Sequence, residues 1–295
     1  MVPGWITPAI PVVILFLSNF EPGPEAIRAL VGLQLVVTFI FFFLGITRLG
    51  SRLVNAFPES VKGGILIGAG IAAITGEIQE GGRLANTPVS LILGFAVTAY
   101  MLFSLSFRDL IEKSRIAKII SGYGMVPGTL VAMSIGWYIN EYPLPAIEFG
   151  ISSPAFGDMW NYLPFSVGFP GLDIIWMAIP TAIIAYIIAF GDIIVGQSLL
   201  DRVDHLRPDE KIEVNVDRVH IVTGLRNLIH SFFAPYPGLA GPLFTGAMAT
   251  IAERYRYGRK AMDTIYSGAG VFWIVALIAL FMLPLVSMFK PVLPI

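Results

Sequence analysis

Nine stretches of mostly apolar residues dominate the sequence, and each approaches the length that a membrane-spanning helix needs. They occupy residues 5–20, 26–47, 61–78, 88–107, 124–140, 172–200, 218–233, 239–252 and 266–289. A helix needs about 20 apolar residues to cross a bilayer. A spanning β-strand would need only about 10 residues of alternating polarity, and no such alternation occurs here. The pattern predicts an all-α integral membrane protein with nine transmembrane segments.

The small supply of charged residues excludes the soluble classes of protein. Only 13% of the residues are charged and 56% are hydrophobic, whereas a soluble domain carries roughly 25% charged residues. The net charge of −1 gives no reason to expect a nucleic acid as partner. The absence of cysteine excludes disulfides, thiolate metal sites and cysteine nucleophiles. We expect a chain embedded in a lipid bilayer, with no cofactor and no metal.

Basic residues are distributed very unevenly between the loops. If the loops alternate between two sides of a membrane, one side holds 15 Lys and Arg residues and the other side holds Arg83 alone. The 15 residues are Arg48, Arg52, Lys62, Arg108, Lys113, Arg115, Lys118, Arg202, Arg207, Lys211, Arg218, Arg254, Arg256, Arg259 and Lys260. Basic loops stay on the cytoplasmic side. We therefore expect a multi-pass protein of a bacterial inner or plasma membrane, with the loop at 141–170 outside.

Two distant segments share a Pro-Gly-x-x-x-Pro pattern, PGWITP at residues 3–8 and PGLAGP at residues 237–242, with an offset of 234 residues. The long apolar helices that follow them open at 25–28 and 260–263, with an offset of 235. Counting from the first segment to the eighth gives seven steps, an odd number, so the second copy enters the membrane from the opposite side. The pattern indicates an inverted-topology repeat, which is the architecture of many secondary transporters.

The repeat also indicates helices that have no counterpart in this chain. Residues 172–233 precede the second copy, and residues 61–140 follow the first copy, without equivalents ahead of residue 1 or beyond residue 295. Restoring both would give a protein of about 440 residues on the logic of such repeats. We therefore expect the chain to be a fragment that lacks both ends.

Several short segments carry a family resemblance. They are LGSRL at 49–53 with Pro58 and VKGG at 61–64, AFGD at 189–192, the stretch 237–250, and YGRK at 257–260. On these residues the sequence resembles the nucleobase:cation symporters of the xanthine/uracil permease type and, more distantly, the sulfate permeases. The resemblance covers essentially the whole chain and implies a seven-plus-seven inverted-repeat fold. In that fold the third and tenth helices are broken, the substrate lies between them, and the eighth helix supplies a carboxylate.

Prolines and glycines predict where the two broken helices lie, around residues 3–11 and 235–242. Proline removes a backbone donor, and in hydrocarbon a broken helix survives only where it lines a cavity or is buried in protein. Each half-helix would point its free N–H groups into that cavity, which suits an anion or the carbonyl oxygens of a nucleobase. The predicted substrate-binding residues are Thr7, Gly238, Leu239, Gly241 and Thr245.

Asp192 is the predicted ion-coupling residue. It follows the apolar run 174–190, with only Gly191 between. The same helical face carries small residues that favour close packing, namely Ala182, Ala185, Ala189 and Gly196. A carboxylate inside a membrane helix is costly and is a functional candidate by default, although a position near the helix end could also reach water. Either a proton or a sodium ion could be the coupling ion.

The residues at 248, 249 and 250 depart from both families and leave the substrate open. The nucleobase permeases place a second carboxylate soon after the proline of the tenth helix, where this chain has Met248 and Ala249. The sulfate permeases place an arginine soon after a Thr-Gly pair, where this chain has Thr250. Arg226 could pair with Asp192 from a neighbouring helix or extend to the membrane surface.

Two other functional classes have weaker support in the sequence. Asp201 and Asp204 resemble the acidic pairs that bind Mg²⁺–pyrophosphate in membrane prenyl transferases, but Asp209 and Glu210 lie in the same loop instead of on a facing helix. A passive channel would be favoured only if transport proved insensitive to ion gradients. We therefore do not expect an enzyme.

These observations predict a secondary active transporter, an ion-coupled symporter of a small polar solute, and we expect a nucleobase such as xanthine or uracil. A sulfate-permease-like transporter of an inorganic or organic anion is the alternative. Residues 1–47 and 171–295 would form a core domain, residues 48–142 a gate domain and residues 143–170 an extracellular loop. The expected partners are the small-molecule substrate, the coupling ion and the lipid bilayer, with a homodimer left open.

Overall fold

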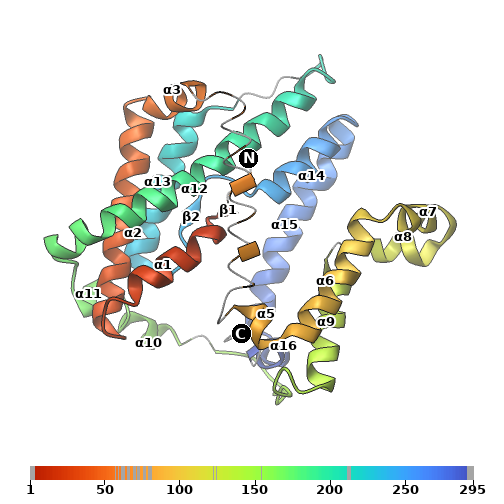
Figure 1. The fold of residues 1–295 in the computed structure, drawn as a ribbon, viewed down its shortest axis with the longest axis horizontal. Helices are drawn as coiled ribbons and strands as arrows, with labels where there is room; N and C mark the ends of the chain where they lie inside the picture. Colours follow the sequence, from red (N-terminus) through yellow and green to blue (C-terminus); the bar gives the residue numbers. More distant parts are fainter. Residues whose placement is uncertain are drawn as a thin grey trace. The chain divides into compact units, whose positions relative to one another are not determined.

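The computed structural model describes residues 4–56, 82–121, 125–153, 155–210 and 214–290, together with positions 58, 60, 64, 67, 68, 71, 74, 75, 78 and 123 (Figure 1). The predicted segment at 61–78 lies for the most part outside the described residues. The chain divides into two compact units, Met1–Ala73 with Ala155–Phe272 and Ile74–Pro154 with Trp273–Ile295. The predicted division into core and gate stays a prediction, since compactness alone does not tell which part moves.

The first unit contains two very short strands and most of the helices. Its elements are β1 (Gly4–Trp5), η1 (Thr7–Ala9), α1 (Ile10–Leu17), α2 (Pro24–Ile46), α3 (Leu49–Ala56), α10 (Phe156–Trp160), α11 (Pro164–Val167), α12 (Leu172–Asp204), α13 (Val216–Phe233), β2 (Ala240–Gly241) and α14 (Thr245–Tyr255). The helix α15 (Arg259–Phe281) begins in this unit and ends in the other.

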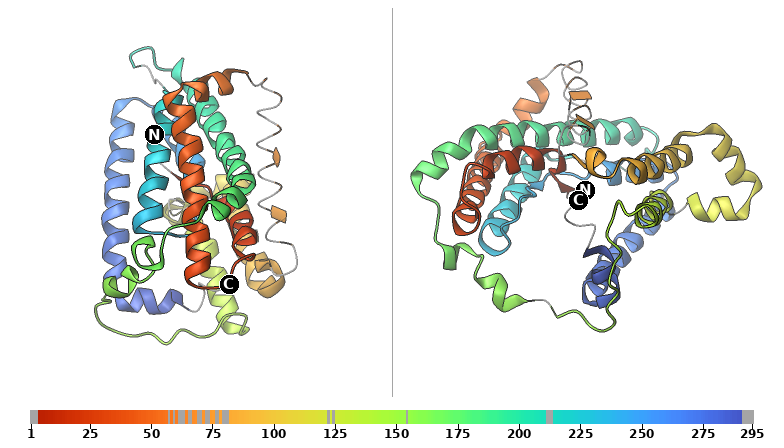
Figure 2. Two further views of the ribbon diagram at one scale, coloured as in Figure 1. Left: turned by 90° about the vertical axis from the view of Figure 1, so that its left-hand side faces the viewer. Right: turned by 60° about the horizontal axis from the view of Figure 1, so that its bottom comes forward.

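Three long helices, α2, α12 and α13, form the frame of the first unit, and both α12 and α13 pack against α2 (Figure 2). Val37 and Phe41 of α2 and Ile193 of α12 are fully buried between these helices. The opposite face of α2 is equally apolar, yet Phe39 is 67% exposed and Ile46 is 70% exposed. A helix that is apolar on both its packed face and its outer face is suited to a lipid environment.

The second unit is built on α6 and α9. Its elements are α5 (Arg83–Asn86), α6 (Pro88–Phe103), α7 (Leu105–Lys113), α8 (Arg115–Ser121), α9 (Val126–Tyr138) and α16 (Leu283–Phe289). A Cβ atom on Gly94 of α6 would lie 2.9 Å from the carbonyl oxygen of Gly128 of α9, so the two backbones approach as closely as glycine permits. Such small-residue contacts are the usual means of packing helices in membranes.

The predicted helical class is confirmed, but the count of nine spans is not. Among the described residues, α2 and α12 alone are long and apolar enough to cross a membrane, and two bent pairs, α6 with α7 and α8 with α9, raise the number to four. The elements at the predicted segments 5–20 and 239–252 include the eight-residue helix α1 and the eleven-residue helix α14. Each is only half a span because an extended segment replaces its first turns.

Glu141 ties the end of α9 to the start of α6 in the second unit. Its two carboxylate oxygens accept hydrogen bonds of 2.8 Å from the backbone N–H groups of Val89 and Ser90, in the first turn of α6. The neighbouring Tyr142 packs on Gly136 of α9, and its hydroxyl accepts a hydrogen bond of 3.0 Å from Ser90. The free N–H groups at a helix start favour a carboxylate there.

We expect the stability of the second unit to depend on the charge of Glu141. Partial burial acts to raise the pKa of Glu141, but hydrogen bonds from Ser90 and Val89 outweigh it and hold this pKa below its ordinary value of 4.5. A lowered pKa contributes stability above the unfolded-state value, and this contribution is lost as the pH falls. In thermal unfolding of the purified protein, Glu141→Gln should therefore unfold at a lower temperature than the unaltered protein at neutral pH. On acidification its unfolding temperature should fall less than that of the unaltered protein. Glu148→Gln, at an exposed site in the same loop, should behave like the unaltered protein; equal acid sensitivity of both variants would contradict the role of Glu141.

Candidate functional site

The two Pro-Gly segments meet directly. β1 and β2 pair in antiparallel fashion, with Gly4 opposite Gly241 and Trp5 opposite Ala240, and the N–H of Ile6 donates a 2.9 Å hydrogen bond to the carbonyl of Leu239. In the repeat, Trp5 corresponds to Leu239 and Ile6 to Ala240. Trp5 thus lies opposite the equivalent of Ile6, and Ile6 opposite the equivalent of Trp5, which is the local two-fold symmetry that an inverted repeat predicts.

A half-helix begins on each side of this strand crossing. After β1 the chain turns into η1 at Thr7 and then into α1, and after β2 it turns into α14 at Thr245. Thr7 is exposed and Thr245 is half-buried. The structure therefore contains both interruptions that the prolines and glycines predict. The first N–H groups of a helix have no partner within it. In the first copy the N–H groups of Ala9 and Ile10 already donate to the carbonyl oxygens of Ile6 and Thr7, so the free donors expected at the crossing are chiefly those at the start of α14.

The close approach at the crossing depends on glycine. A Cβ atom on Gly4 would lie 2.6 Å from the carbonyl oxygen of Leu243, and one on Gly241 would lie 3.0 Å from the carbonyl carbon of Trp5. Both neighbours are backbone atoms that cannot move aside cheaply. Gly238 is buried, and Leu239 is fully buried in the hydrophobic core. The geometry brings the predicted substrate-binding residues together at the crossing, and their contact with a substrate stays a prediction.

Arg226 and Asn227 of α13 form hydrogen bonds with the backbone of the two strands at the crossing. Arg226 donates 2.6 and 3.0 Å hydrogen bonds to the carbonyl oxygens of Gly241 and Gly4. The side-chain amide of Asn227 accepts from the N–H of Ala240 at 2.9 Å and donates to its carbonyl at 2.8 Å. The sequence left two alternatives open for Arg226, an ion pair with Asp192 or extension to the membrane surface. Both are wrong, because Arg226 bonds to the backbone of the crossing. The sequence signal for this arrangement was an Arg-Asn pair within an apolar segment.

Asp192 lies on α12, one helical turn before the point where this helix meets the residue preceding α14. Gly196, one helical turn further along α12, packs against Leu243, which immediately precedes the half-helix. The small residues predicted to form a packing face are all buried: Ala182, Ala185, Ala189 and Gly196. Asp192 itself is half-buried, and among the described residues its carboxylate has no hydrogen-bond or ion-pair partner. An unpaired carboxylate at this place is free to take up a cation or a proton.

The other end of α14 is fixed to the loop that follows α12. Arg207, only 4% exposed, donates to both carboxylate oxygens of Asp209, at 3.2 and 2.7 Å, and at 2.6 Å to Glu210. Its guanidinium also lies 4.6 Å from the centre of the Tyr255 ring, at the last residue of α14. The hydrogen bond to Asp209 raises the pKa of Arg207 above its usual range and holds the pKa of Asp209 below its ordinary value. The half-helix is thus held at both ends.

The two histidines of α13 are engaged in packing. His220 is fully buried, and its ring nitrogens lie 3.0 Å from the hydroxyl of Tyr186 and 2.8 Å from the carbonyl of Val216. His230 packs edge-on against Trp5, with 4.8 Å between the ring centres. These contacts give both histidines a structural role.

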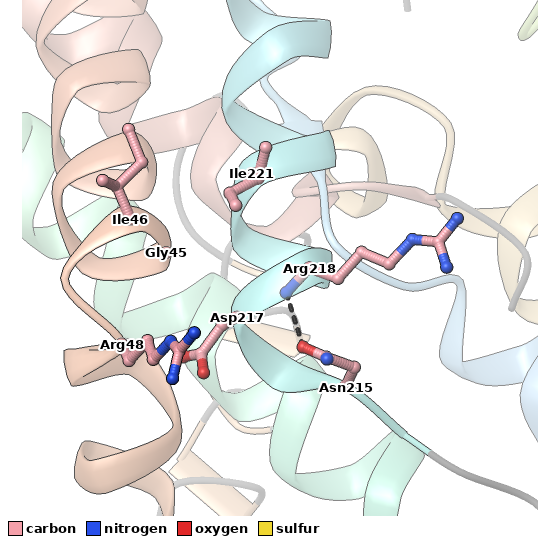
Figure 3. Close-up of a pocket in the computed structure, with 7 residues that line it drawn as sticks. All are labelled: Gly45, Ile46, Arg48, Asn215, Asp217, Arg218 and Ile221. Atoms are coloured by element: carbon pink, nitrogen blue, oxygen red, sulfur yellow. Dashed lines mark hydrogen bonds between the residues drawn. The ribbon is translucent and has the colours of Figure 1, made fainter.

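A separate hollow lies where α2 ends and α13 begins (Figure 3). It has a volume of about 660 Å³ and is lined by Gly45, Ile46, Arg48, Asn215, Asp217, Arg218 and Ile221. Arg48 and Arg218 belong to the loops predicted to face the cytoplasm. None of the predicted substrate-binding residues lines this hollow, so it is distinct from the strand crossing.

A crossing of two broken segments inside an apolar helical frame is the arrangement of a membrane transporter. The comparison with known families agrees with this class. The sequence model of a family described as a permease family, the xanthine/uracil permeases, matches residues 2–292. The chain therefore belongs to the xanthine/uracil permease family, within the nucleobase:cation symporters. Membership of this family points to a multi-pass membrane transporter rather than to an enzyme. No curated protein matches the chain.

Proposed function

We propose that this permease is an ion-coupled symporter that carries a nucleobase such as xanthine or uracil. The substrate would bind where the half-helices begin, with Thr7, Gly238, Leu239, Gly241 and Thr245 around it. The observation that carries the proposal is the β1–β2 crossing, because it brings the start of α14, with its free N–H donors, beside the first broken segment. A nucleobase offers carbonyl oxygens as matching acceptors.

Asp192 would couple the ion to the substrate. Its position one turn from the contact between Gly196 and Leu243 supports this role, because ion binding would then be felt at the start of α14. Met248, near the point where the nucleobase permeases carry a second carboxylate, is buried against Leu200 and Leu243. The coupling would therefore rest on a single carboxylate, with a proton or a sodium ion as the cation.

The division into core and gate belongs to the same proposal. The crossing, α12 and α13 lie within residues 1–47 and 171–295, which would form the core domain. Residues 48–142 would form the gate against which the core moves, and alternating access would follow from that motion.

Uptake by vesicles that contain the full-length protein tests the proposed function. The panel should hold xanthine, uracil, sulfate and a small carboxylate, with the pH gradient and the sodium gradient varied separately. We expect accumulation of a nucleobase that follows one of the two ion gradients. Uptake that never exceeds the outside concentration under either gradient would contradict coupled transport.

A transporter of inorganic or organic anions is the second candidate, and Arg226 favours it. The guanidinium carries a permanent positive charge to the carbonyl oxygens of the crossing, and two helix starts add partial positive charge there. Accumulation of sulfate or the carboxylate in the same panel, without a nucleobase, would identify this function instead.

A further inference from the structure

We propose that Arg226 and Asn227 form a clasp that holds the β1–β2 crossing in its register and thereby positions both half-helix starts for substrate. In this arrangement α13 determines the geometry of the binding site through positioning residues. The consequence for substrate binding rests on the proposed function, whereas the clasp itself is independent of which solute is carried.

The first part of the argument concerns backbone groups that the two-stranded ladder cannot satisfy. In an antiparallel ladder, hydrogen-bonded and non-hydrogen-bonded residue pairs alternate. Ile6 and Leu239 form a hydrogen-bonded pair, so Trp5 and Ala240 form a non-hydrogen-bonded pair whose N–H and C=O groups point away from the partner strand. Ala240 is fully buried, and unpaired backbone groups in apolar surroundings are costly.

Asn227 meets both of these groups with one side chain. Its Oδ1 atom accepts from the N–H of Ala240 and its Nδ2 atom donates to the carbonyl of Ala240. Asn227 is fully buried and makes the contacts that a third strand would make. An aspartate in its place would keep the acceptor but lose the donor, and an alanine would lose both.

Arg226 adds a bridge between the two copies of the repeat. One guanidinium nitrogen bonds to Gly241 in the second copy and the other bonds to Gly4 in the first. These two residues lie opposite each other in the ladder. The planar fork of arginine can reach two acceptors at a fixed spacing, whereas lysine presents a single compact charge and cannot replace it at such a site.

The clasp is itself anchored in the frame of the unit. A Cβ atom on Gly224 of α13 would lie 2.8 Å from the Phe42 ring, and one on Gly45 of α2 would lie 2.9 Å from the carbonyl oxygen of Asp217. This close packing fixes α13 against α2. In addition, Gln34 of α2 donates a 3.0 Å hydrogen bond to the carbonyl of Tyr236, in the segment that leads into β2. Two frame helices thus determine where the crossing lies.

Cross-linking tests the clasp without any assay of transport. The chain has no cysteine, so a Trp5→Cys, Ala240→Cys pair would hold its only thiols. The Cα atoms of a non-hydrogen-bonded pair lie about 4.5 Å apart, which is within reach of a disulfide. We expect rapid disulfide formation when Arg226 and Asn227 are present. Arg226→Lys or Asn227→Ala should lower the rate of disulfide formation at least about tenfold, because the hydrogen bonds that each variant loses contribute a free energy equivalent to about a tenfold change in an equilibrium constant.

Substrate affinity provides the second measurement, made on the chain without added cysteines. Arg226→Lys should weaken binding of xanthine or uracil about tenfold, while the ratio of ion-driven accumulation to exchange stays that of the unaltered protein, because positioning changes binding and leaves the coupling ion alone. The matched control is Arg218→Lys, an exposed position on the same helix, which should change neither quantity.

The outcomes separate the two proposals. Unchanged cross-linking in both clasp variants would overturn the clasp. Slower cross-linking with unchanged affinity would overturn its positioning role. If cross-linking slows as expected but the unaltered protein binds neither nucleobase, the clasp stands and the proposed nucleobase function fails.

Discussion

Replacing Asp192 with asparagine is expected to abolish ion-driven accumulation of substrate. Asparagine keeps the volume and the hydrogen-bonding capacity of the side chain but cannot take up or release a proton. If one proton is coupled, each pH unit of gradient supports about tenfold accumulation, and the variant should fall to the outside concentration. Exchange of substrate down its own gradient should continue, because exchange need not carry the ion. The measurement is uptake of labelled nucleobase into vesicles, with and without the gradient.

The control for this experiment is Asp201→Asn, because Asp201 is exposed near the end of the same helix. It should accumulate substrate like the unaltered protein. Loss of both accumulation and exchange in Asp192→Asn would indicate that the carboxylate holds the substrate directly. Full accumulation by Asp192→Asn would show that the carboxylate is only a solvated group near a helix end.

Gly4→Ala is expected to displace the strand crossing and to abolish substrate binding. The added carbon would lie 2.6 Å from the carbonyl oxygen of Leu243 and 2.9 Å from the Cα atom of Phe244, both of them backbone atoms. Such overpacking typically costs about 1–3 kcal/mol. The displacement would also move the start of α14, so we expect binding to fall by far more than the loss of stability alone explains. Calorimetric binding and thermal unfolding of the purified protein measure the two effects.

Gly157→Ala is the matched control for this variant. Gly157 lies in α10, and an added Cβ atom would meet nothing within 4 Å. This variant should bind and unfold like the unaltered protein. If Gly4→Ala binds substrate with unchanged affinity, the site does not depend on the crossing.

Local signals in the sequence predicted the elements well. The apolar stretch at 26–47 corresponds to α2 (Pro24–Ile46), and the stretch at 172–200 corresponds to α12 (Leu172–Asp204). The prolines and glycines at 3–8 and 237–242 predicted the two interruptions, since their effect on the backbone is local. The count of spans was less predictable, because hydropathy does not distinguish a full span from a half-helix that follows an extended segment.

Sequence alone determined the helical membrane class, the two interrupted segments and the candidate carboxylate Asp192, because apolar length, proline placement and an isolated charge act within a few residues of chain. The tertiary structure decided the register of Trp5 opposite Ala240 and the partners of Arg226 and Asn227. The pairing of Trp5 with Ala240 and the bond from Arg226 to Gly4 join residues more than 200 positions apart, whereas Asn227 and Ala240 are 13 positions apart. These contacts form because broken helices leave backbone groups unpaired in apolar surroundings, and only the packing of α13 against α2 determines which polar side chain can reach them.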